Sequence, residues 1–511
     1  MKEKLKKLID DRKTPFAVNC TNEEEATELL KALADLGYCW NHNEPILDDA
    51  GNVMHTYLSS KTGESSYYFF DSFPLVYYGR KEFFRTINSE IIPFADFREG
   101  NLAFTAAADN KITYVEIFDR TAIENICSAL AQTPDKIIFV GRNLREMEKA
   151  CEIYKTILNR DGEDITFECR VCGDKLDDIV SVFSEIAVQE SLCCFDITGG
   201  DDFYLLALGI VAERMKDKNI QIHRFDINHK KIYDCDNDGI MPFEKFPSLS
   251  VEEDIAIYGG RMASTSISDD AIIVNDINAL WEVQKKFTGG EWNYVTAALG
   301  EFMSRFKERN PLQFRIPFDE IFSKGEVEEI AKHPMIAALK KQGIFRFVGT
   351  HKPFFTFEFK NEFIKQCLLK SGNLLELKIY HLIKSAKKSD GVTPLFNDVQ
   401  TGVIMNWTEC PDIGSATHNE IDVMFMDELI PVFVSCKNGK VTFDELYKLN
   451  TVAANFGGKY ARKILVCTDS NAKNMPVFCM RARDMGIKII NNLREKTDEQ
   501  LLDLLRDYNT I

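Results

Sequence analysis

The 511-residue sequence lacks the features that would place it in a membrane or in a secretory pathway. No stretch approaches the roughly 18 consecutive apolar residues that a transmembrane helix needs. The N-terminal segment MKEKLKKLIDDRK is charged and has no apolar core, so it does not resemble a secretory signal. We therefore expect a cytoplasmic protein without a membrane partner.

The chain also lacks the common motifs for structural zinc and for nucleotide cofactors. Its 14 cysteines follow no regular spacing, and CRVC is a lone CxxC pair without a second pair at zinc spacing. Neither a GK[ST] phosphate-binding loop nor a GxGxxG dinucleotide motif is present. Structural zinc, NAD and a Walker-type nucleotide site are therefore not expected.

Positive charge is scarce, because the formal net charge is −17. Such a charge disfavours a protein that coats duplex DNA with a wide basic face. Residues 371–511 contain 17 Lys and Arg against 18 Asp and Glu, so the rest of the chain carries almost all of the excess acid. The C-terminal part is thus the region most compatible with a polyanionic substrate, and a nuclease, which needs only local positive charge, stays open.

The length and the pattern of the sequence predict an α/β protein of four domains. Residues 1–105 resemble a small α+β domain of unknown role, and residues 251–370 predict a helical connector that ends in a winged-helix-like helix and hairpin. Residues 106–250 alternate strands and helices, which predicts a parallel, doubly wound sheet. One of its predicted helices spans residues 120–132. Residues 371–511 predict a last α/β domain.

The stretch NEIDVMFMDELIPVFVSCKNG places carboxylates and a lysine at adjacent ends of two paired strands. The two-residue period of a strand puts Glu420 and Asp422 on one face, and puts Ser435 and Lys437 on one face of the next strand. Phosphodiester cleavage uses a divalent cation with oxygen ligands, and a nearby lysine can neutralise the developing charge. We expect Glu376, on the preceding helix, to join Glu420 and Asp422 as metal ligands.

The order helix–strand–strand–strand–helix–strand over about 370–490, together with these residues, resembles the PD-(D/E)xK nuclease superfamily. The usual second strand carries D/E-x-K, whereas SCK places Ser435 at the carboxylate position. Either Glu420 or Glu445, from the following helix, could supply the missing carboxylate. An inactive nuclease-like scaffold is the alternative, but a lysine kept in an apolar strand is costly unless it is paired or functional. The resemblance implies a catalytic set and a Mn²⁺ or Mg²⁺ site that draw on Glu376, Glu420, Asp422, Ser435, Lys437 and Glu445.

A second cluster of polar residues follows the strands of the 106–250 domain. In CCFDITGGDDFYLLALG a buried strand ends at Thr198, Gly199 and Gly200, and a helix starts near Asp202. Two glycines let backbone N–H groups approach a ligand, and carboxylates at the helix start suit hydroxyl or amino groups. A tight turn without a ligand is the alternative. The candidate ligand-binding residues at this sheet edge are Asp119, Arg120, Gly141, Arg142, Asn143, Thr198, Gly199, Gly200, Asp201 and Asp202.

These positions, over about 112–235, resemble the CARF domain, the Rossmann-like sensor of cyclic oligoadenylates in type III CRISPR systems. A CARF domain, a winged-helix connector and a PD-(D/E)xK domain in this order resemble the CRISPR ancillary nucleases that such rings activate. The resemblance implies a homodimer that binds cyclic tetra-adenylate as an allosteric activator and cleaves single-stranded RNA, single-stranded DNA or plasmid DNA. The alternatives are a ligand-responsive DNA-binding regulator with an inactive nuclease-like domain, and a nuclease without ligand control.

Overall fold

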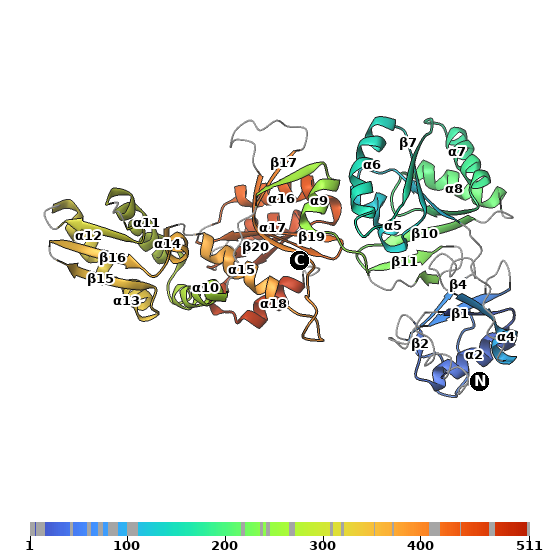
Figure 1. Ribbon diagram of the computed structural model, residues 1–511, viewed down its shortest axis with the longest axis horizontal. Helices are drawn as coiled ribbons and strands as arrows, with labels where there is room; N and C mark the ends of the chain where they lie inside the picture. Colours follow the sequence, from blue (N-terminus) through green and yellow to red (C-terminus); the bar gives the residue numbers. More distant parts are fainter. Residues whose placement is uncertain are drawn as a thin grey trace. The chain divides into compact units, whose positions relative to one another are not determined.

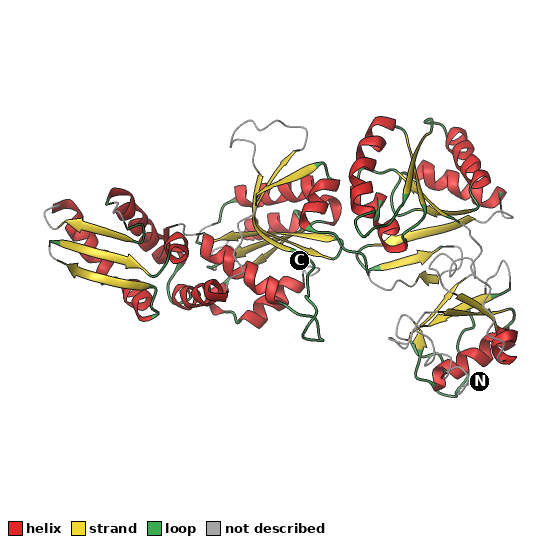
Figure 2. Ribbon diagram, viewed as in Figure 1, coloured by secondary structure: helices red, strands yellow, loops and turns green. Residues whose placement is uncertain are grey.

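The computed structural model divides into two compact units, Met1–Pro247 and Ser248–Ile511, each with its own sheets (Figures 1 and 2). None of the helices in the described part of the chain combines the length and the apolar character needed to cross a membrane. The structure describes residues 6, 16–40, 44–58, 63–69, 75–79, 90–99, 111–215, 220–235, 239–241, 246–264, 271–306, 310–317, 321–351, 353–369, 372–407, 419–439, 441–469 and 476–507.

The first sheet of the N-terminal unit has five strands in the order β2-β4-β3-β1-β5. Helix α2 (Glu23–Asp35) covers it and begins at Asn22, whose side chain accepts a hydrogen bond from the Glu25 N–H. The helix buries its leucine face in an aromatic-rich core. The bounds are β1 Phe16–Cys20, β2 Cys39–Trp40, β3 Ser65–Phe69, β4 Leu75–Gly79, β5 Glu90–Pro93 and α4 Phe94–Glu99.

The second sheet of this unit has seven strands in the order β12-β11-β10-β9-β6-β7-β8. The strands from β10 to β8 run parallel, as the strand–helix alternation predicts, and β11 and β12 add an antiparallel edge. Figure 1 shows α6 on one side of the sheet and α7 and α8 on the other. The bounds are β6 Ile112–Ile117, β7 Lys136–Gly141, α6 Leu144–Leu158, β8 Thr166–Val171, α7 Leu176–Gln189, β9 Leu192–Asp196, α8 Asp202–Arg214, β10 Ile220–Asp226, β11 Lys231–Asp234 and β12 Gly239–Met241.

The predicted single helix at 120–132 is wrong. The chain instead forms a short 3₁₀ turn, η1 (Ala122–Asn125), followed by α5 (Cys127–Gln132). The buried Asn125 side chain explains the break, because it accepts a hydrogen bond from the Asp119 N–H and donates one to the Asp119 carbonyl. An asparagine that bonds the backbone six residues earlier replaces helical hydrogen bonds with a tight turn.

The C-terminal unit contains a six-stranded sheet in the order β13-β17-β18-β19-β20-β21. Its first four strands pair antiparallel, whereas β19, β20 and β21 pair in parallel. The apolar faces of α15 and α18 pack on one side of the sheet, and α9 and α16 contact each other on its other side (Figure 1). The bounds are α9 Val251–Ile257, β13 Gly260–Ser264, α15 Asn373–Ser385, β17 Val399–Trp407, β18 Asn419–Asp427, β19 Ile430–Lys437, α16 Phe443–Gly457, η3 Gly458–Tyr460, β20 Arg462–Cys467, α17 Pro476–Asp484, β21 Ile487–Ile490, η5 Leu493–Glu495 and α18 Asp498–Arg506.

A three-stranded sheet in the order β14-β16-β15 shares a second core of this unit with the helices around it. In chain order a helix, a strand, two helices and two strands follow one another from α11 to β16. The bounds are α10 Ala271–Gln284, α11 Gly289–Arg305, β14 Gln313–Pro317, α12 Ile321–Lys332, α13 Pro334–Lys341, β15 Phe345–His351, β16 Phe354–Phe359 and α14 Glu362–Leu369.

The segment 251–370 does not form one separate body. Strand β13 pairs with β17 at the edge of the six-stranded sheet, from Gly260 opposite Trp407 to Ser264 opposite Ile404. Gly260 lies against the ring of Phe456 from α16, where a Cβ atom would come within 2.7 Å of that ring. The start of the expected connector is thus part of the C-terminal sheet, which the local sequence pattern does not reveal because strand pairing is long-range.

Candidate functional site

The strands β18 and β19 separate at the position of the predicted catalytic residues. Their ladder runs from Asp427 opposite Ile430 to Val423 opposite Val434 and ends there, whereas β18 stays paired with β17 as far as Asn419. Strand separation leaves backbone N–H groups free of the ladder. The split therefore opens a space between the two strands in which side chains and backbone donors can meet.

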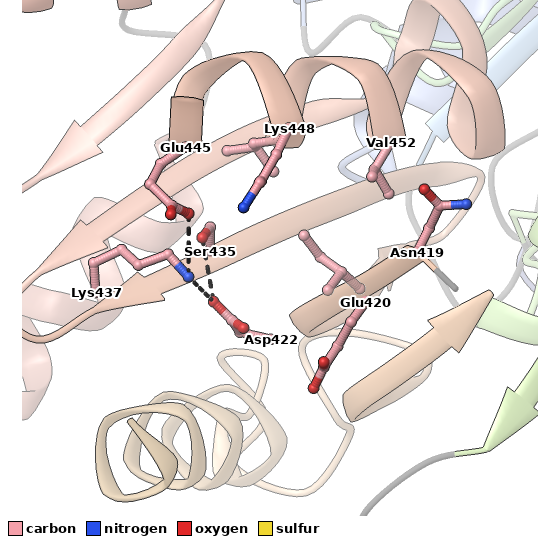
Figure 3. A pocket seen from close by; sticks show the side chains of 10 residues that line it. Asn419, Glu420, Asp422, Ser435, Lys437, Glu445, Lys448 and Val452 are labelled. Atoms are coloured by element: carbon pink, nitrogen blue, oxygen red, sulfur yellow. Dashed lines mark hydrogen bonds and ion pairs between the residues drawn. The ribbon is translucent and has the colours of Figure 1, made fainter. Parts of the chain in front are cut away.

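Asp422 lies at the mouth of this split and receives three hydrogen bonds on one oxygen, Oδ2. The donors are the Ser435 hydroxyl at 3.2 Å, the Cys436 N–H at 2.6 Å and the Lys437 ammonium at 3.3 Å. Glu445, from the first turn of α16, lies on the other side of the same ammonium, with its Oε2 3.3 Å from Lys437 Nζ. Figure 3 shows this chain of contacts from Ser435 through Asp422 and Lys437 to Glu445.

The Lys437 ammonium is charged in this environment. Burial disfavours the charge, but the carboxylates of Asp422 and Glu445 outweigh it and raise the pKa of Lys437 above its ordinary value. The three side chains keep between 15% and 30% of their surface exposed, so solvent and a substrate can reach them. The site thus presents one cation between two carboxylates at an accessible sheet end.

The Ser435 hydroxyl, at the position of the expected carboxylate, donates a hydrogen bond to Asp422. It is 6% exposed and fixes the orientation of the Asp422 carboxylate together with the Cys436 N–H. Of the two compensations considered from the sequence, Glu445 is the residue that reaches Lys437. Glu420 lines the same cavity, but in Figure 3 its carboxylate points away from Lys437 and Glu445.

The cavity has a volume of about 400 Å³, and polar side chains from two strands and one helix line it. Lys448, one turn after Glu445 on α16, is a lining residue that the sequence reasoning missed, although its three-residue spacing from Glu445 puts both on one helix face. Glu376 is not among the lining residues. A Cβ atom on Gly372 would lie 3.1 Å from Glu376 Oε1, so this carboxylate turns back over the start of its own helix, α15.

The expected metal ligands Glu376, Glu420 and Asp422 do not form a three-carboxylate cage. Within the described ranges no group of three or more His, Cys, Asp or Glu side chains is placed to hold a metal ion. Magnesium and manganese sites at phosphate esters are commonly built from one or two carboxylates, completed by water and substrate oxygens. All three hydrogen bonds to the Asp422 carboxylate go to Oδ2. A site of that kind, which would draw on Asp422 Oδ1, therefore fits the cavity.

In the N-terminal unit, the ends of β6 and β9 meet as the sequence predicts. Asp119 follows β6, and its Oδ2 accepts a hydrogen bond of 3.4 Å from the Gly200 N–H. The turn needs both glycines. A Cβ atom on Gly199 would lie 3.1 Å from the Asp119 Cβ, and Gly200 combines a φ of +99° with only 2.6 Å to Ile117 Cγ2. The predicted turn is therefore packed tightly against the end of the neighbouring strand.

The end of β7 meets the start of α8 through Arg142. Its guanidinium lies 3.2 Å from Asp201 Oδ2, 3.1 Å from Asp174 Oδ1 and over the ring of Tyr204. Asp201 is the N-cap of α8 and accepts hydrogen bonds from the first backbone N–H groups of the helix. Asp202 is exposed in the first turn. Both oxygens of the Asp201 carboxylate are thus engaged within the chain, Oδ1 by two N–H groups of the helix and Oδ2 by Arg142.

Of the remaining predicted ligand residues, two form hydrogen bonds within the domain, one is closely packed and one is exposed. The Thr198 hydroxyl donates to Asp196 and accepts from the Phe225 N–H, which ties β9 to β10. Asn143 caps α6 by accepting from the Glu146 N–H. Position 141 has no room for a side chain, because a Cβ atom on Gly141 would come within 2.9 Å of the Met147 sulfur. Arg120 is exposed next to the edge formed by Asp119.

A buried carboxyl pair below the glycine turn was missed from the sequence. Glu116 and Asp196 are opposite each other on β6 and β9, and each is 1% exposed. Burial raises the pKa of Asp196 to about 6 and raises that of Glu116 well above its ordinary value. Since Asp196 holds Thr198, the pair supports the predicted ligand turn from below. Only the register of two strands distant in sequence brings the two residues together.

Residues 365–510 match the family model of the Card1-like endonuclease domain. The match falls on the region that contains Asp422, Lys437 and Glu445. No curated protein matches the chain.

Two solved structures share the fold of most of the chain. VC1899 from Vibrio cholerae has a TM-score of 0.58 and 17% sequence identity, with 77% of this chain and 96% of that chain covered. Can2 from Sulfobacillus thermosulfidooxidans, solved in complex with cyclic tetra-adenylate, has a TM-score of 0.54 and 15% identity, with 77% and 97% covered. At such identities the likeness shows a common fold.

Proposed function

We propose that this chain is a nuclease activated by a cyclic oligoadenylate, with cyclic tetra-adenylate as the activator, and that it acts in type III CRISPR antiviral defence. The observation that carries the nuclease part is the joint placement of Asp422, Lys437 and Glu445 at the split of β18 and β19. This placement lies inside the region that matches an endonuclease domain. The fold likeness to Can2, whose structure contains cyclic tetra-adenylate, supports the activator.

The chemistry proposed for the site is hydrolysis of a phosphodiester in RNA or DNA. Asp422, with Glu420 from the same cavity as a second carboxylate, would hold a Mn²⁺ or Mg²⁺ ion, which when bound polarises the phosphate and activates water. The charged Lys437 donates hydrogen bonds to the phosphate oxygen on which negative charge develops. Asp422 and Glu445 hold that ammonium in place, and Ser435 orients Asp422.

The seven-stranded sheet of residues 106–250 is proposed as the CARF sensor. Its ligand edge combines the backbone of Thr198, Gly199 and Gly200 with Asp119 and the exposed Arg120. Backbone N–H groups and a cation suit the phosphates of a nucleotide ring. A symmetric ring suits a homodimer with two such edges, and ring binding changes activity only through a different affinity for two states of the dimer.

The remaining assignments follow the same layout. Residues 251–370 are proposed to include a winged-helix-like connector, for which the order of elements from α11 to β16 is the support. Residues 371–511, with β13 from the preceding segment, are proposed as the PD-(D/E)xK domain. Residues 1–105 are proposed as a separate small α+β domain, and no role is assigned to it.

The test is cleavage of single-stranded RNA, single-stranded DNA and supercoiled plasmid in Mn²⁺, with and without cyclic tetra-adenylate. Cleavage that requires both the metal and the ring supports the proposal and identifies the substrate. Lys437→Ala is expected to abolish cleavage and to retain ring binding, whereas Gly199→Trp is expected to abolish ring binding and activation. Cleavage at an unchanged rate without the ring would refute ring control.

A ligand-responsive DNA-binding regulator is the second candidate, and Ser435 at the usual carboxylate position is the observation that favours it. In that case the C-terminal domain binds nucleic acid without cutting it. A gel shift on duplex DNA that depends on the ring, without cleavage in Mn²⁺, would select this candidate over the nuclease.

A further inference from the structure

A helix outside the matched endonuclease region contacts the loop that directly follows Lys437. Asn293, in the second turn of α11, donates from Nδ2 to the Asn438 carbonyl at 3.1 Å. Asn438 donates from its own Nδ2 to Asn293 Oδ1 at 3.1 Å. The two asparagines thus form a reciprocal pair, which fixes the backbone and the side chain of the residue next to Lys437.

The pair is part of a larger junction at the ends of β19 and β20. The Thr468 hydroxyl, just after β20, donates to Asn438 Oδ1 at 2.9 Å and accepts from the Gly439 N–H at 3.2 Å. The following residue, Asp469, accepts from the Gly289 N–H at the start of α11 at 3.1 Å. Thr468 therefore joins the two loops to each other, whereas Asn293 and Gly289 join α11 to one loop each.

The first residue of α11, Gly289, packs so closely against these loops that no side chain would fit there. A Cβ atom on Gly289 would lie 2.8 Å from Asp469 Oδ2 and 2.9 Å from the Gly439 nitrogen. Arg494 holds Asp469 from the other side at 3.0 Å and donates to the Phe287 carbonyl just before α11. The start of α11 is thus fastened on both sides, so a shift of the helix moves the loop as well.

We infer that Asn293 is a positioning residue for Lys437, so that the proposed nuclease site is completed by α11, outside residues 365–510. The inference rests on the proposed function in so far as Lys437 is catalytic. Lys437 is the last residue of β19, and its ammonium must stay 3.3 Å from both Asp422 and Glu445. Fixing Asn438 fixes the backbone from which that side chain extends.

The first measurement is the cleavage kinetics of Asn293→Ala under activating conditions. Because small displacements of a catalytic group cost up to about 100-fold in rate, we expect kcat to fall roughly 10- to 100-fold with KM little changed. Asn438→Ala removes the side-chain half of the pair and the acceptor of Thr468, so its kcat should fall as well. Because the two variants share the contact between the two side chains, the loss in the double variant should be smaller than the product of the two single losses. The control is Tyr294→Phe, the neighbour on α11 whose hydroxyl bonds Glu329 instead of the loop.

The second measurement does not depend on activity. Amide hydrogen exchange should accelerate in Asn293→Ala at Cys436 and Gly439, whose N–H groups bond Asp422 and Thr468, and stay unchanged at Val423 in the intact ladder. If the wild-type protein does not cleave any substrate, the proposed function is wrong. In that case the rate of hydrogen exchange at Cys436 and Gly439 alone tests whether Asn293 positions the loop. If wild type cleaves, but Asn293→Ala has wild-type kcat and wild-type exchange, the inference is wrong and the proposed function stands.

Discussion

The buried pair of Glu116 and Asp196 gives the N-terminal unit a stability that depends on pH. Burial raises the pKa of Asp196 from 3.8 to about 6, although hydrogen bonds from neighbours such as Thr198 oppose the rise. The folded state therefore holds this proton at a higher pH than the unfolded chain does. Its contribution to stability is fully present below pH 3.8 and is lost as the pH rises through about 6.

The size of this contribution follows from the shift. A rise of about two pKa units, at 1.36 kcal/mol each, corresponds to roughly 3 kcal/mol in the free energy of unfolding. In Asp196→Asn the side chain cannot ionise, but its Oδ1 still accepts from the Thr198 N–H. The difference in unfolding free energy, variant minus wild type, should therefore increase by about 2.4 kcal/mol between pH 4 and pH 7.5, because part of the full contribution is already lost at pH 4.

The assay is urea unfolding of the full chain at several pH values, followed by hydrogen exchange of peptides that contain β9. The control is Phe195→Leu, a substitution of the buried neighbour of Asp196 on β9 that changes no ionisable group. Its difference from wild type should be nearly constant with pH. A constant difference for Asp196→Asn, or an equally pH-dependent one for Phe195→Leu, would show that Asp196 is not the group that titrates.

Three further predictions concern the two sites. Lys437→Ala should lower kcat by about 100- to 1000-fold in the cleavage assay, as loss of a group that stabilises transition-state charge does. Lys448→Ala should lower kcat far less, because Lys448 lines the same cavity but forms no ion pair with Asp422 or Glu445; equal losses would contradict the role given to Lys437. Ser435→Ala removes one hydrogen bond to Asp422, worth about 1 kcal/mol, so kcat should fall about five-fold; an unchanged kcat would leave Ser435 without a positioning role. Gly200→Ala should destabilise the N-terminal unit by roughly 1–3 kcal/mol in urea unfolding, because of its φ of +99° and its close contact with Ile117 at the end of the neighbouring strand β6; a stability equal to wild type would refute the strained turn.

Local sequence patterns determined most of the secondary structure and one half of the candidate site. The alternation of strands and helices predicted from 112 to 227 forms a parallel sheet in the structure. The prediction succeeded because the spacing of apolar residues and the length of each segment suffice to distinguish buried strands from amphipathic helices. The two-residue period also placed Asp422, Ser435 and Lys437 together, since a hairpin brings the ends of its own strands to one place. The break in the helix at Asn125 was not predicted. The Asn125 side chain bonds the backbone of Asp119 in place of helical hydrogen bonds, and the spacing of apolar residues does not reveal such a contact.

The sequence by itself thus determined which strand ends carry carboxylates, glycines and the lysine. Only the tertiary structure decided which of these groups meet. Strand register paired Glu116 with Asp196, and the packing of α16 brought Glu445 rather than Glu376 to Lys437. The approach of α11 joined Asn293 to Asn438 across 145 residues. Contacts of this kind depend on how whole elements pack, and no local pattern encodes the partner that packing selects.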